Sequence, residues 1–236
     1  IAHNIAIIMD GNRRWASARG LPSIEGHRRG VSTLKNIVRE SSNMNVKQLS
    51  VFGFSSENLK RPMKEVKALI NLIEWYLKSE IAELSEKNVI LKIFGQRNIF
   101  PENLIKLFEL AENVTSKNTG LNLNVFLNYG GKMDLINAAF KISKEIKTNN
   151  ISLDQINETI FRSHLLSSQV SDVDLLIRTS GEKRLSNFMM WQLSYAELYF
   201  SDTLWPDFTT KEYKLAIKNF SKRERRYGSS AVKEIN

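Results

Sequence analysis

The chain contains no cysteine and only four prolines in 236 residues. The absence of cysteine excludes disulfide bonds, thiolate metal sites and thiol catalysis, and it fits a protein of the reducing cytoplasm, where we expect this chain to act. The longest apolar runs have the length of a strand, and polar residues interrupt every helical segment. We therefore predict neither a membrane span nor a signal peptide.

Glycine and proline are too scattered to form a linker, and no repeat or low-complexity tract is present. The hydrophobic content of 42% is sufficient for a large core. We therefore predict a single domain over residues 1–236.

Positive charge exceeds negative charge, and the formal net charge is +9. Two basic clusters are Arg13, Arg14, Arg19, Arg28 and Arg29 near the start, and Lys222, Arg223, Arg225 and Arg226 near the end. A polyanion-binding module is therefore an alternative function. However, aromatic residues do not alternate with the clusters as in a base-stacking surface, so we expect no nucleic-acid partner. Diphosphates and anionic membrane surfaces suit a basic protein equally well.

Apolar runs alternate with helical segments along most of the chain. The predicted strands cover residues 5–9, 48–54, 89–94, 121–127, 173–178 and 197–200, and the predicted helices begin at Pro62, Pro101, Asp134 and Lys211. This order predicts an α/β fold with a central, mainly parallel, six-stranded sheet flanked by helices. The runs are apolar without strict alternation, as in strands that are covered on both faces.

The first predicted strand ends in the sequence Asp10-Gly11-Asn12-Arg13-Arg14. Ligands of open α/β sheets bind beyond the carboxyl ends of strands, and a glycine turn there can direct amide groups at phosphate oxygens. A carboxylate at this place suits Mg²⁺, and arginines match phosphate. The alternative is an ordinary turn with solvated arginines.

Polar groups also follow other predicted strands. The segment Ser55-Ser56-Glu57-Asn58, followed by Arg61, is either part of a site or a helix cap. Arg178 and Arg184 flank a glycine turn and, with Ser186, could enclose a diphosphate; the alternative is a solvated loop.

Two further residues have both a structural and a functional interpretation. Glu197 lies in an aromatic run, where a structural ion pair and a metal site are comparably favoured. His27 can donate to a phosphate or act as a simple cap or surface residue. No zinc-hydrolase or Ser-His-Asp pattern occurs.

Taken in order, these segments resemble the cis-prenyltransferase family, and in particular its bacterial members that make undecaprenyl diphosphate. The matching segments are HNIAIIMDGNRRW (3–15), GHRRG (26–30), FGFSSENLKRP (52–62), LNYGGKMD (127–134), DVDLLIRTSGEKRLSNFMMWQLSYAELYF (172–200), LWPDF (204–208) and RERRYG (223–228). The Asp-rich D-D-x-x-D motif of trans-prenyltransferases is absent.

The resemblance implies repeated addition of isopentenyl diphosphate to an allylic diphosphate such as farnesyl diphosphate. Each addition would form a Z double bond, and the expected product is a long polyprenyl diphosphate, such as the undecaprenyl diphosphate that serves as lipid carrier precursor for cell-wall synthesis. Mg²⁺ would assist departure of the allylic diphosphate. The alternative within the family is a non-catalytic subunit.

Site residues follow from the resemblance position by position. Asp10 would hold the metal and be essential to catalysis, and Glu197 would complete the metal environment. The allylic diphosphate would be held by Gly11, Asn12, Arg13, Arg14 and His27, the isopentenyl diphosphate by Arg178, Arg184 and Ser186, and the reacting centre lined by Ser55, Ser56, Glu57, Asn58 and Arg61. Trp15 and Leu185 are further implied substrate-binding residues, and Asn58 and Ser55 would handle the proton lost from the isopentenyl unit.

The chain departs from the family pattern at three places. Ser23 stands where many members have arginine, Leu59 where tryptophan is frequent, and Lys183 where some have histidine. These departures bear on substrate affinity and product length more than on the reaction.

The hydrocarbon product requires a dry apolar tunnel between sheet and helices. Its expected lining is the helix from Val66 to Leu84, with Gly53, Leu121, Leu123 and Val125; plain core packing is the alternative. The resemblance also implies a homodimer, joined near residues 191–200 and the C-terminal Arg226-Tyr227-Gly228. Transient contact with the inner face of the plasma membrane is a further expectation.

Overall fold

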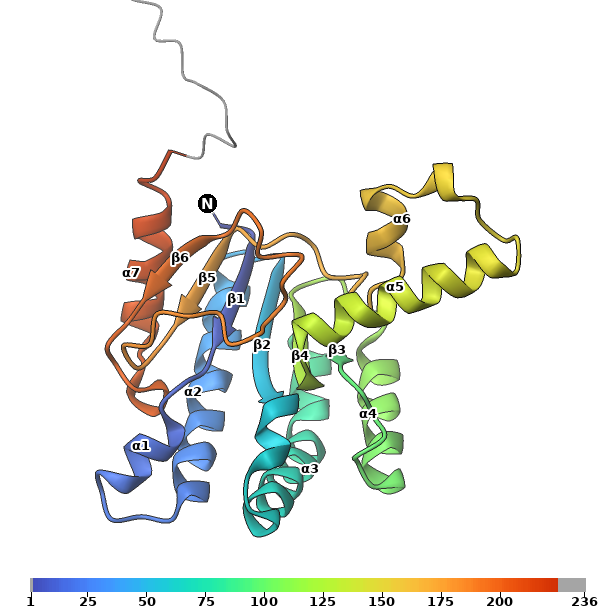
Figure 1. The fold of residues 1–236 in the computed structure, drawn as a ribbon. Coiled ribbons are helices and arrows are strands. Elements are labelled where there is room, and N and C mark those ends of the chain that lie inside the picture. Colours follow the sequence, from blue (N-terminus) through green and yellow to red (C-terminus); the bar gives the residue numbers. More distant parts are fainter. Residues whose placement is uncertain (1, 225–236) are drawn as a thin grey trace, which may run out of the picture.

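The computed structural model describes residues 2–224 and has a six-stranded sheet at its centre (Figure 1). The strands are β1 (Asn4–Ile8), β2 (Gln48–Ser55), β3 (Ile90–Phe94), β4 (Asn122–Tyr129), β5 (Leu175–Arg178) and β6 (Glu197–Phe200). Their order is β3-β4-β2-β1-β5-β6, and every neighbouring pair is parallel. The predicted fold class is confirmed.

The register of the strands places their carboxyl ends at one edge of the sheet. Ile5 lies opposite Leu49 of β2 and Leu175 of β5, and Leu175 lies opposite Glu197 of β6. Side chains that follow β1, β2 and β5 can therefore meet at this edge, which is where parallel sheets bind ligands.

Seven helices and three short 3₁₀ segments occur in the described residues 2–224. They are α1 (Asn12–Ser17), α2 (Ser23–Asn43), η1 (Ser56–Lys60), α3 (Met63–Glu86), α4 (Glu102–Thr115), α5 (Gly131–Lys147), η2 (Leu153–Gln155), α6 (Glu158–Ser163), η3 (Trp205–Asp207) and α7 (Thr210–Phe220). The predicted helices correspond to α3, α4, α5 and α7. None of the helices in residues 2–224 is both long enough and apolar enough to cross a membrane.

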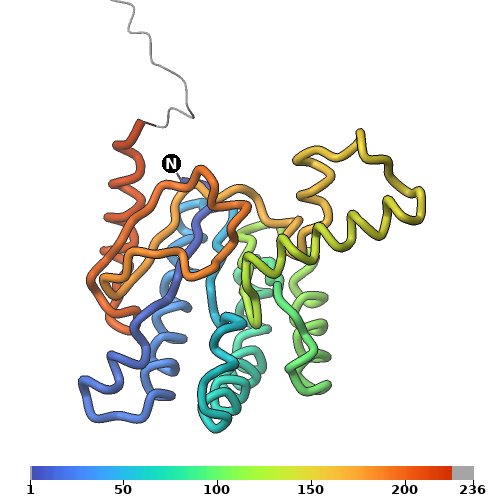
Figure 2. Tube along the Cα trace, viewed as in Figure 1, coloured from blue at the N-terminus to red at the C-terminus, as the bar shows by residue number. Residues whose placement is uncertain are grey.

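The two faces of the sheet are covered differently. The helices α2, α3, α4 and α7 pack on one face around a large core that includes Ile37, Leu69 and Phe108. A smaller core around Phe126 and Phe188 covers the other face, under α5 and the segment that connects β5 to β6. In the trace of Figure 2, this connecting segment runs beside the end of β1, although the two are far apart in the sequence.

Candidate active site at the carboxyl edge of the sheet

Asp10 lies just beyond the end of β1, where two arginines contact its carboxylate. Oδ2 accepts a hydrogen bond from Arg178 Nη2 at 2.8 Å, and Oδ1 lies 3.4 Å from Arg14 Nη2. Arg178 can contact Asp10 because Arg178 is the last residue of β5 and lies opposite Ile8 of β1. Partial burial acts to raise the pKa of Asp10, but Arg178 and Arg14 outweigh burial and hold the pKa below its usual value. Asp10 is therefore a carboxylate at neutral pH.

The backbone of Asp10 is fixed by Thr179, which is not among the predicted site residues. Asp10 N donates to Thr179 Oγ1 at 3.0 Å, and Thr179 Oγ1 donates to the Asp10 carbonyl at 2.7 Å. Trp205 N donates to the same carbonyl at 2.9 Å. The only sequence signal for Thr179 is its place between Arg178 and the glycine turn.

Arg178 connects Asp10 to the loop that follows β5. Its side chain is buried, Nη1 donates to Ser186 Oγ at 2.6 Å and to the Arg184 carbonyl, and Nε has no hydrogen-bond partner. The side chain of Arg184 instead is 62% exposed and pairs with Glu182. The structure thus brings Arg178 and Ser186 together and leaves the Arg184 side chain at the rim.

The first residues of this loop are not a solvated turn. Thr179 and Ser180 are buried, and Ser180 and Gly181 have φ values of 74° and 75°, which turn the chain back toward β1. Arg14 Nη2 donates to Ser180 Oγ at 2.5 Å, and Arg14 Nη1 lies 3.2 Å from Glu182 Oε1. The loop therefore forms a wall of the site.

His27 and Asn12 form a pair below this wall. Asn12 Nδ2 lies 3.3 Å from His27 Nδ1, while Asn12 Oδ1 and His27 Nε2 are buried without a partner. Burial, then repulsion from Arg61 and Arg13, lowers the pKa of His27 to about 4. The imidazole is therefore neutral at pH 7, and because Nδ1 accepts from Asn12, we assign its proton to Nε2.

Two glycines of the GHRRG segment allow this pair to form. A Cβ at Gly26 would lie 1.9 Å from the Asn12 carbonyl oxygen, and one at Gly30 would lie 2.4 Å from Asn12 Oδ1. Gly11 begins the turn with φ of 111°, which favours glycine. Gly26 and Gly30 thus let α1 lie directly against α2.

A polar cavity of about 570 Å³ opens beside these residues. It is lined by Met9, Asp10, Gly11, Asn12, Arg13, Arg14, Ser17, Leu21, Ser23, His27 and Arg61. Arg61 Nη1 lies 3.2 Å from Glu65 Oε1, and Arg13 Nε lies 3.6 Å from the same oxygen. Most predicted ligands of the allylic diphosphate therefore line one cavity, and Ser23 lies on it as well. Trp15 does not line it, because its ring nitrogen donates to Asp207 at 2.8 Å.

The segment after β2 caps η1, and Ser55, Ser56, Glu57 and Asn58 are not among the residues that line the polar cavity. Asn58 Oδ1 accepts from Ser55 N at 3.1 Å in a reciprocal capping box of η1. Ser56 Oγ donates to Glu57 Oε2 at 3.2 Å, and Glu57 Oε1 accepts from Asn187 Nδ2 at 2.8 Å. Asn187 is not among the predicted residues, and it links this segment to the loop after β5. Leu185 of that loop packs against the smaller core.

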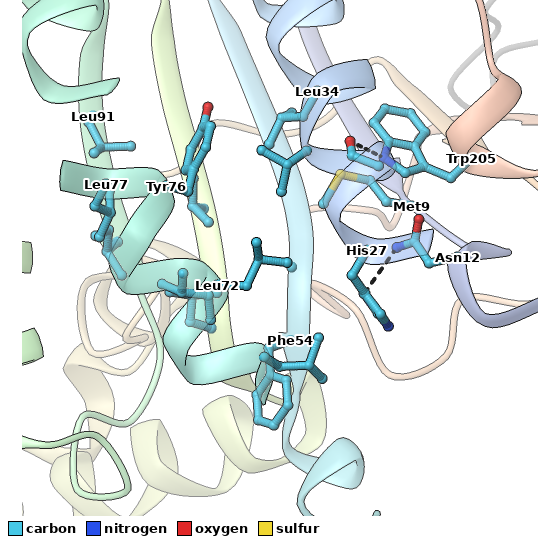
Figure 3. A pocket seen from close by; sticks show the side chains of 18 residues that line it. Met9, Asn12, His27, Leu34, Phe54, Leu72, Tyr76, Leu77, Leu91 and Trp205 are labelled. Atoms are coloured by element: carbon cyan, nitrogen blue, oxygen red, sulfur yellow. Dashed lines mark hydrogen bonds between the residues drawn. The ribbon is translucent and has the colours of Figure 1, made fainter. Parts of the chain in front are cut away.

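An apolar cavity adjoins the polar one between the sheet, α2 and α3 (Figure 3). Its volume is about 110 Å³, and Met9, Asn12 and His27 line both cavities. Of the predicted helix from Val66 to Leu84, the part from Leu69 to Leu77 lines this cavity, and the predicted Gly53 and Val125 of the sheet line it too. Leu34, Leu91 and Trp205 also line it and were not predicted. Leu121 and Leu123 do not line it, and both are buried in the larger core.

The structure does not bring Glu197 to Asp10 within one chain. Glu197 begins β6 at the level of Ile5, five residues before Asp10, which is roughly 16 Å along the strands at about 3.3 Å per residue. Glu197 Oε2 accepts from Arg223 Nη1 at 2.7 Å, so the ion-pair interpretation describes this chain. Residues 2–224 contain no group of three or more His, Cys, Asp or Glu side chains that could hold a metal ion.

Fold and site together define an α/β protein that can hold an anionic group at the carboxyl ends of its strands, next to an apolar cavity. The family described as "Putative undecaprenyl diphosphate synthase" matches residues 8–228. The chain belongs to this family of prenyltransferases, and the predicted resemblance is confirmed.

Similar proteins agree with this assignment. The chain is 47% identical to an isoprenyl transferase of Halalkalibacterium halodurans, over 97% of this chain and 89% of that protein. It is 45% identical to a farnesyl-diphosphate-specific ditrans,polycis-undecaprenyl-diphosphate synthase of Haemophilus influenzae, over 98% and 96%. A lavandulyl diphosphate synthase from Lavandula x intermedia in complex with dimethylallyl diphosphate is similar in structure, with a TM-score of 0.93, 34% identity and coverage of 97% and 98%.

Proposed function

We propose that this prenyltransferase condenses isopentenyl diphosphate repeatedly with an allylic diphosphate, in the first step farnesyl diphosphate, to give a long Z-polyprenyl diphosphate such as undecaprenyl diphosphate. In each step the allylic C–O bond breaks and diphosphate leaves. A new C–C bond forms to the isopentenyl unit, which then loses a proton.

One observation carries the proposal: a cationic polar cavity adjoins an apolar cavity and shares three lining residues with it. An allylic diphosphate has an anionic head and a hydrocarbon tail, and each end matches one of the two cavities. Polyanions without a hydrocarbon tail would use only the first cavity. The arrangement therefore supports a prenyl diphosphate substrate over a general polyanion.

The donor set at Asp10 fits Mg²⁺. This ion is usually held by one or two carboxylates together with substrate phosphates and water, and Asp10 supplies one carboxylate at the rim of the polar cavity. The 3.4 Å contact with Arg14 is long, so this oxygen can exchange partners. When bound, Mg²⁺ would neutralise charge that develops on the departing diphosphate.

The cations and the neutral imidazole around the polar cavity would orient the allylic diphosphate. Arg13 and Arg14 provide forked donors, and the unpartnered Nε2–H of His27 can donate to a phosphate oxygen. Because the pKa of His27 is about 4, the imidazole is neutral at pH 7 and carries only this one proton. We assign the isopentenyl diphosphate to Arg178, Ser186 and Arg184, whose exposed side chain is able to rotate toward it.

Ser55 and Asn58 retain the proposed role with the proton of the isopentenyl unit. The bond from Ser55 N to Asn58 Oδ1 fixes the amide, and the Ser55 hydroxyl lies at the carboxyl end of β2. Glu57, between them, is held as a carboxylate by its bonds to Asn187 and Ser56.

We further propose a homodimer, a cytoplasmic location and transient contact with the inner face of the plasma membrane, to which the long product belongs. The predicted metal role of Glu197 would then require the site of the second copy, since in its own chain Glu197 is bonded to Arg223. Flotation with anionic liposomes tests the membrane contact, and absence of binding would remove it.

The decisive experiment incubates the protein with labelled isopentenyl diphosphate, farnesyl diphosphate and Mg²⁺ and resolves the extracted products by chain length. We expect a ladder of long polyprenyl products that is lost with EDTA and in Asp10→Ala. Asp154→Ala, on an exposed carboxylate of η2, is the matched control and should retain the ladder. No incorporation with any allylic primer, from folded protein, would favour the non-catalytic subunit. Binding of polyanions that survives Asp10→Ala and falls steeply with salt would favour the polyanion-binding module.

A further inference from the structure

Asn187 lies where the loop after β5 meets both α5 and the segment after β2. Its φ is 63° and that of the preceding Ser186 is 48°, so two consecutive residues have left-handed backbone. Residues other than glycine adopt this backbone region at a cost in free energy, and asparagine tolerates it better than most residues. Such a backbone persists where the surroundings hold it in place.

The first contact of Asn187 is with the start of α5. Gly131 N donates to the Asn187 carbonyl at 2.7 Å, and Lys132 N donates to Asn187 Oδ1 at 2.8 Å. The first amides of a helix have no partner within the helix, and Gly130 before α5 offers no side chain as a cap. A residue far away in the sequence therefore caps this 17-residue helix.

The second contact is with Glu57. Asn187 Nδ2 donates to Glu57 Oε1 at 2.8 Å. Burial acts to raise the pKa of Glu57, but hydrogen bonds, that from Asn187 first among them, hold it below its usual value. A Cβ at Gly130 would lie 2.8 Å from both Asn187 Nδ2 and Ser56 Oγ, so the glycine leaves the space that this contact needs.

We propose that Asn187 is a positioning residue that fixes the segment Ser55–Asn58 relative to Arg178 and Ser186. One side of Asn187 is covalently joined to Ser186, which accepts from Arg178 at 2.6 Å, and its amide holds Glu57. The inference rests on the proposed function, in which the segment Ser55–Asn58 handles the proton and Arg178 and Ser186 bind isopentenyl diphosphate. Asn187 then sets the distance between the place where the isopentenyl unit is held and the place where it reacts.

The variant Asn187→Asp separates this role from helix capping. Aspartate keeps an oxygen for the Lys132 amide and favours a helix N-terminus, but it loses the donor and places a second carboxylate against Glu57. We expect kcat/KM for isopentenyl diphosphate to fall about tenfold or more, as when a hydrogen bond to a charged group is lost. The midpoint of thermal unfolding should stay near that of the wild type. Asn187→Ala, which loses both contacts, should lower activity and the midpoint together.

The double variant Asn187→Asp/Glu57→Gln is the matched rescue, because the new glutamine amide can donate to the new aspartate. We expect its kcat/KM to exceed that of Asn187→Asp several-fold, although Glu57→Gln alone lowers activity. The inference would be overturned if kcat/KM were unchanged in Asn187→Asp. It would also be overturned if the kcat/KM of the double variant were no higher than the product of the two single effects predicts. The wild type is assayed in parallel: if it makes no polyprenyl product, the proposed function fails; if it is active, only the role of Asn187 is at stake.

Discussion

Charges of opposite sign alternate across the site at the scale of single residues. Asp10 lies between Arg178 and Arg14, and Glu65 lies between Arg61 and Arg13. Each carboxylate thus holds two cations in place before a ligand binds. The donors are therefore already oriented when a diphosphate enters. This lowers the free energy of reorganisation for binding the diphosphate and for its departure.

His27 gives this site a dependence of stability on pH. The pKa of His27 is about 4 in the folded chain against 6.5 for an unperturbed histidine, so between these values the unfolded chain takes up a proton that the folded chain does not. Stability therefore falls as pH falls from about 6.5 to about 4. At pH 5 the loss should be about 2 kcal/mol relative to pH 7.5.

Urea unfolding at both pH values, for the wild type and His27→Gln, measures this loss. Other titrating groups act on both proteins, so the difference between them isolates His27. Equal losses in the two proteins would contradict a buried, neutral imidazole.

Residues of the site divide into those that sequence reasoning can find and those that it cannot. Asp10, Arg14 and Arg178 carry distinctive chemistry at the ends of predicted strands, His27 stands out in the GHRRG segment, and the structure brings them together. Asn187 and Thr179 act through hydrogen bonds to residues more than a hundred positions away, for which local sequence holds no signal. Glu197 begins β6 at the level of Ile5, away from Asp10 of the same chain, which its sequence motif does not reveal, and its metal role stays a prediction.

At the scale of elements, the apolar runs of the sequence predict the strands of the sheet correctly, whereas the long helix α2 was not predicted. Apart from β6 at the edge, the strands consist mainly of apolar runs that are buried on both faces, so their pattern is clear from the sequence. The helix α2 was not among the predicted helices, because the first half of its buried face consists of Gly26, Gly30 and Thr33, which are not recognisable as an apolar stripe. Those glycines are explained by the close approach of α1 to Gly26 and of both α1 and Trp205 to Gly30.

Gly53 of β2 provides a test of the apolar cavity as a binding site for the growing chain. A Cβ there would lie 3.0 Å from Leu127 Cδ2 and 3.7 Å from Val125 Cγ1, so a larger side chain must project along the cavity wall. We expect Gly53→Val to shift the products to shorter chains while the first additions continue. Chain-length analysis of the labelled products measures the shift.

The control for this test is Val114→Leu, which adds bulk at an exposed position of α4 away from the cavity. It should leave the product distribution unchanged. An unaltered distribution in Gly53→Val would mean that the chain does not grow along this wall.

At the scale of the whole molecule, the sheet ends in a strand that has a neighbour on one side only. β6 is at the edge, and Met190, Tyr195 and Leu198 on or near it are exposed. An edge strand with apolar side chains is a template for association. The C-terminal Arg226-Tyr227-Gly228, expected to reach the partner, lies outside the described residues.

We expect Leu198→Arg to convert a dimer into a monomer, because a charge would be buried at the interface. Sedimentation velocity measures the change. Leu110→Arg, on an exposed leucine of α4, should leave the assembly intact. A wild type that sediments as a monomer would exclude the dimer. A dimer that Leu198→Arg leaves intact would place the interface away from β6.

The small size of the apolar cavity has a consequence for how readily a released product binds again. A cavity of about 150 Å³ holds a single benzene ring, so the 110 Å³ between the sheet and α3 must enlarge for any prenyl chain. On the proposed function, the growing chain would therefore separate α3 from the sheet, and the walls would close again after its release. Because separating α3 from the sheet costs free energy, this closure would weaken rebinding of a released product.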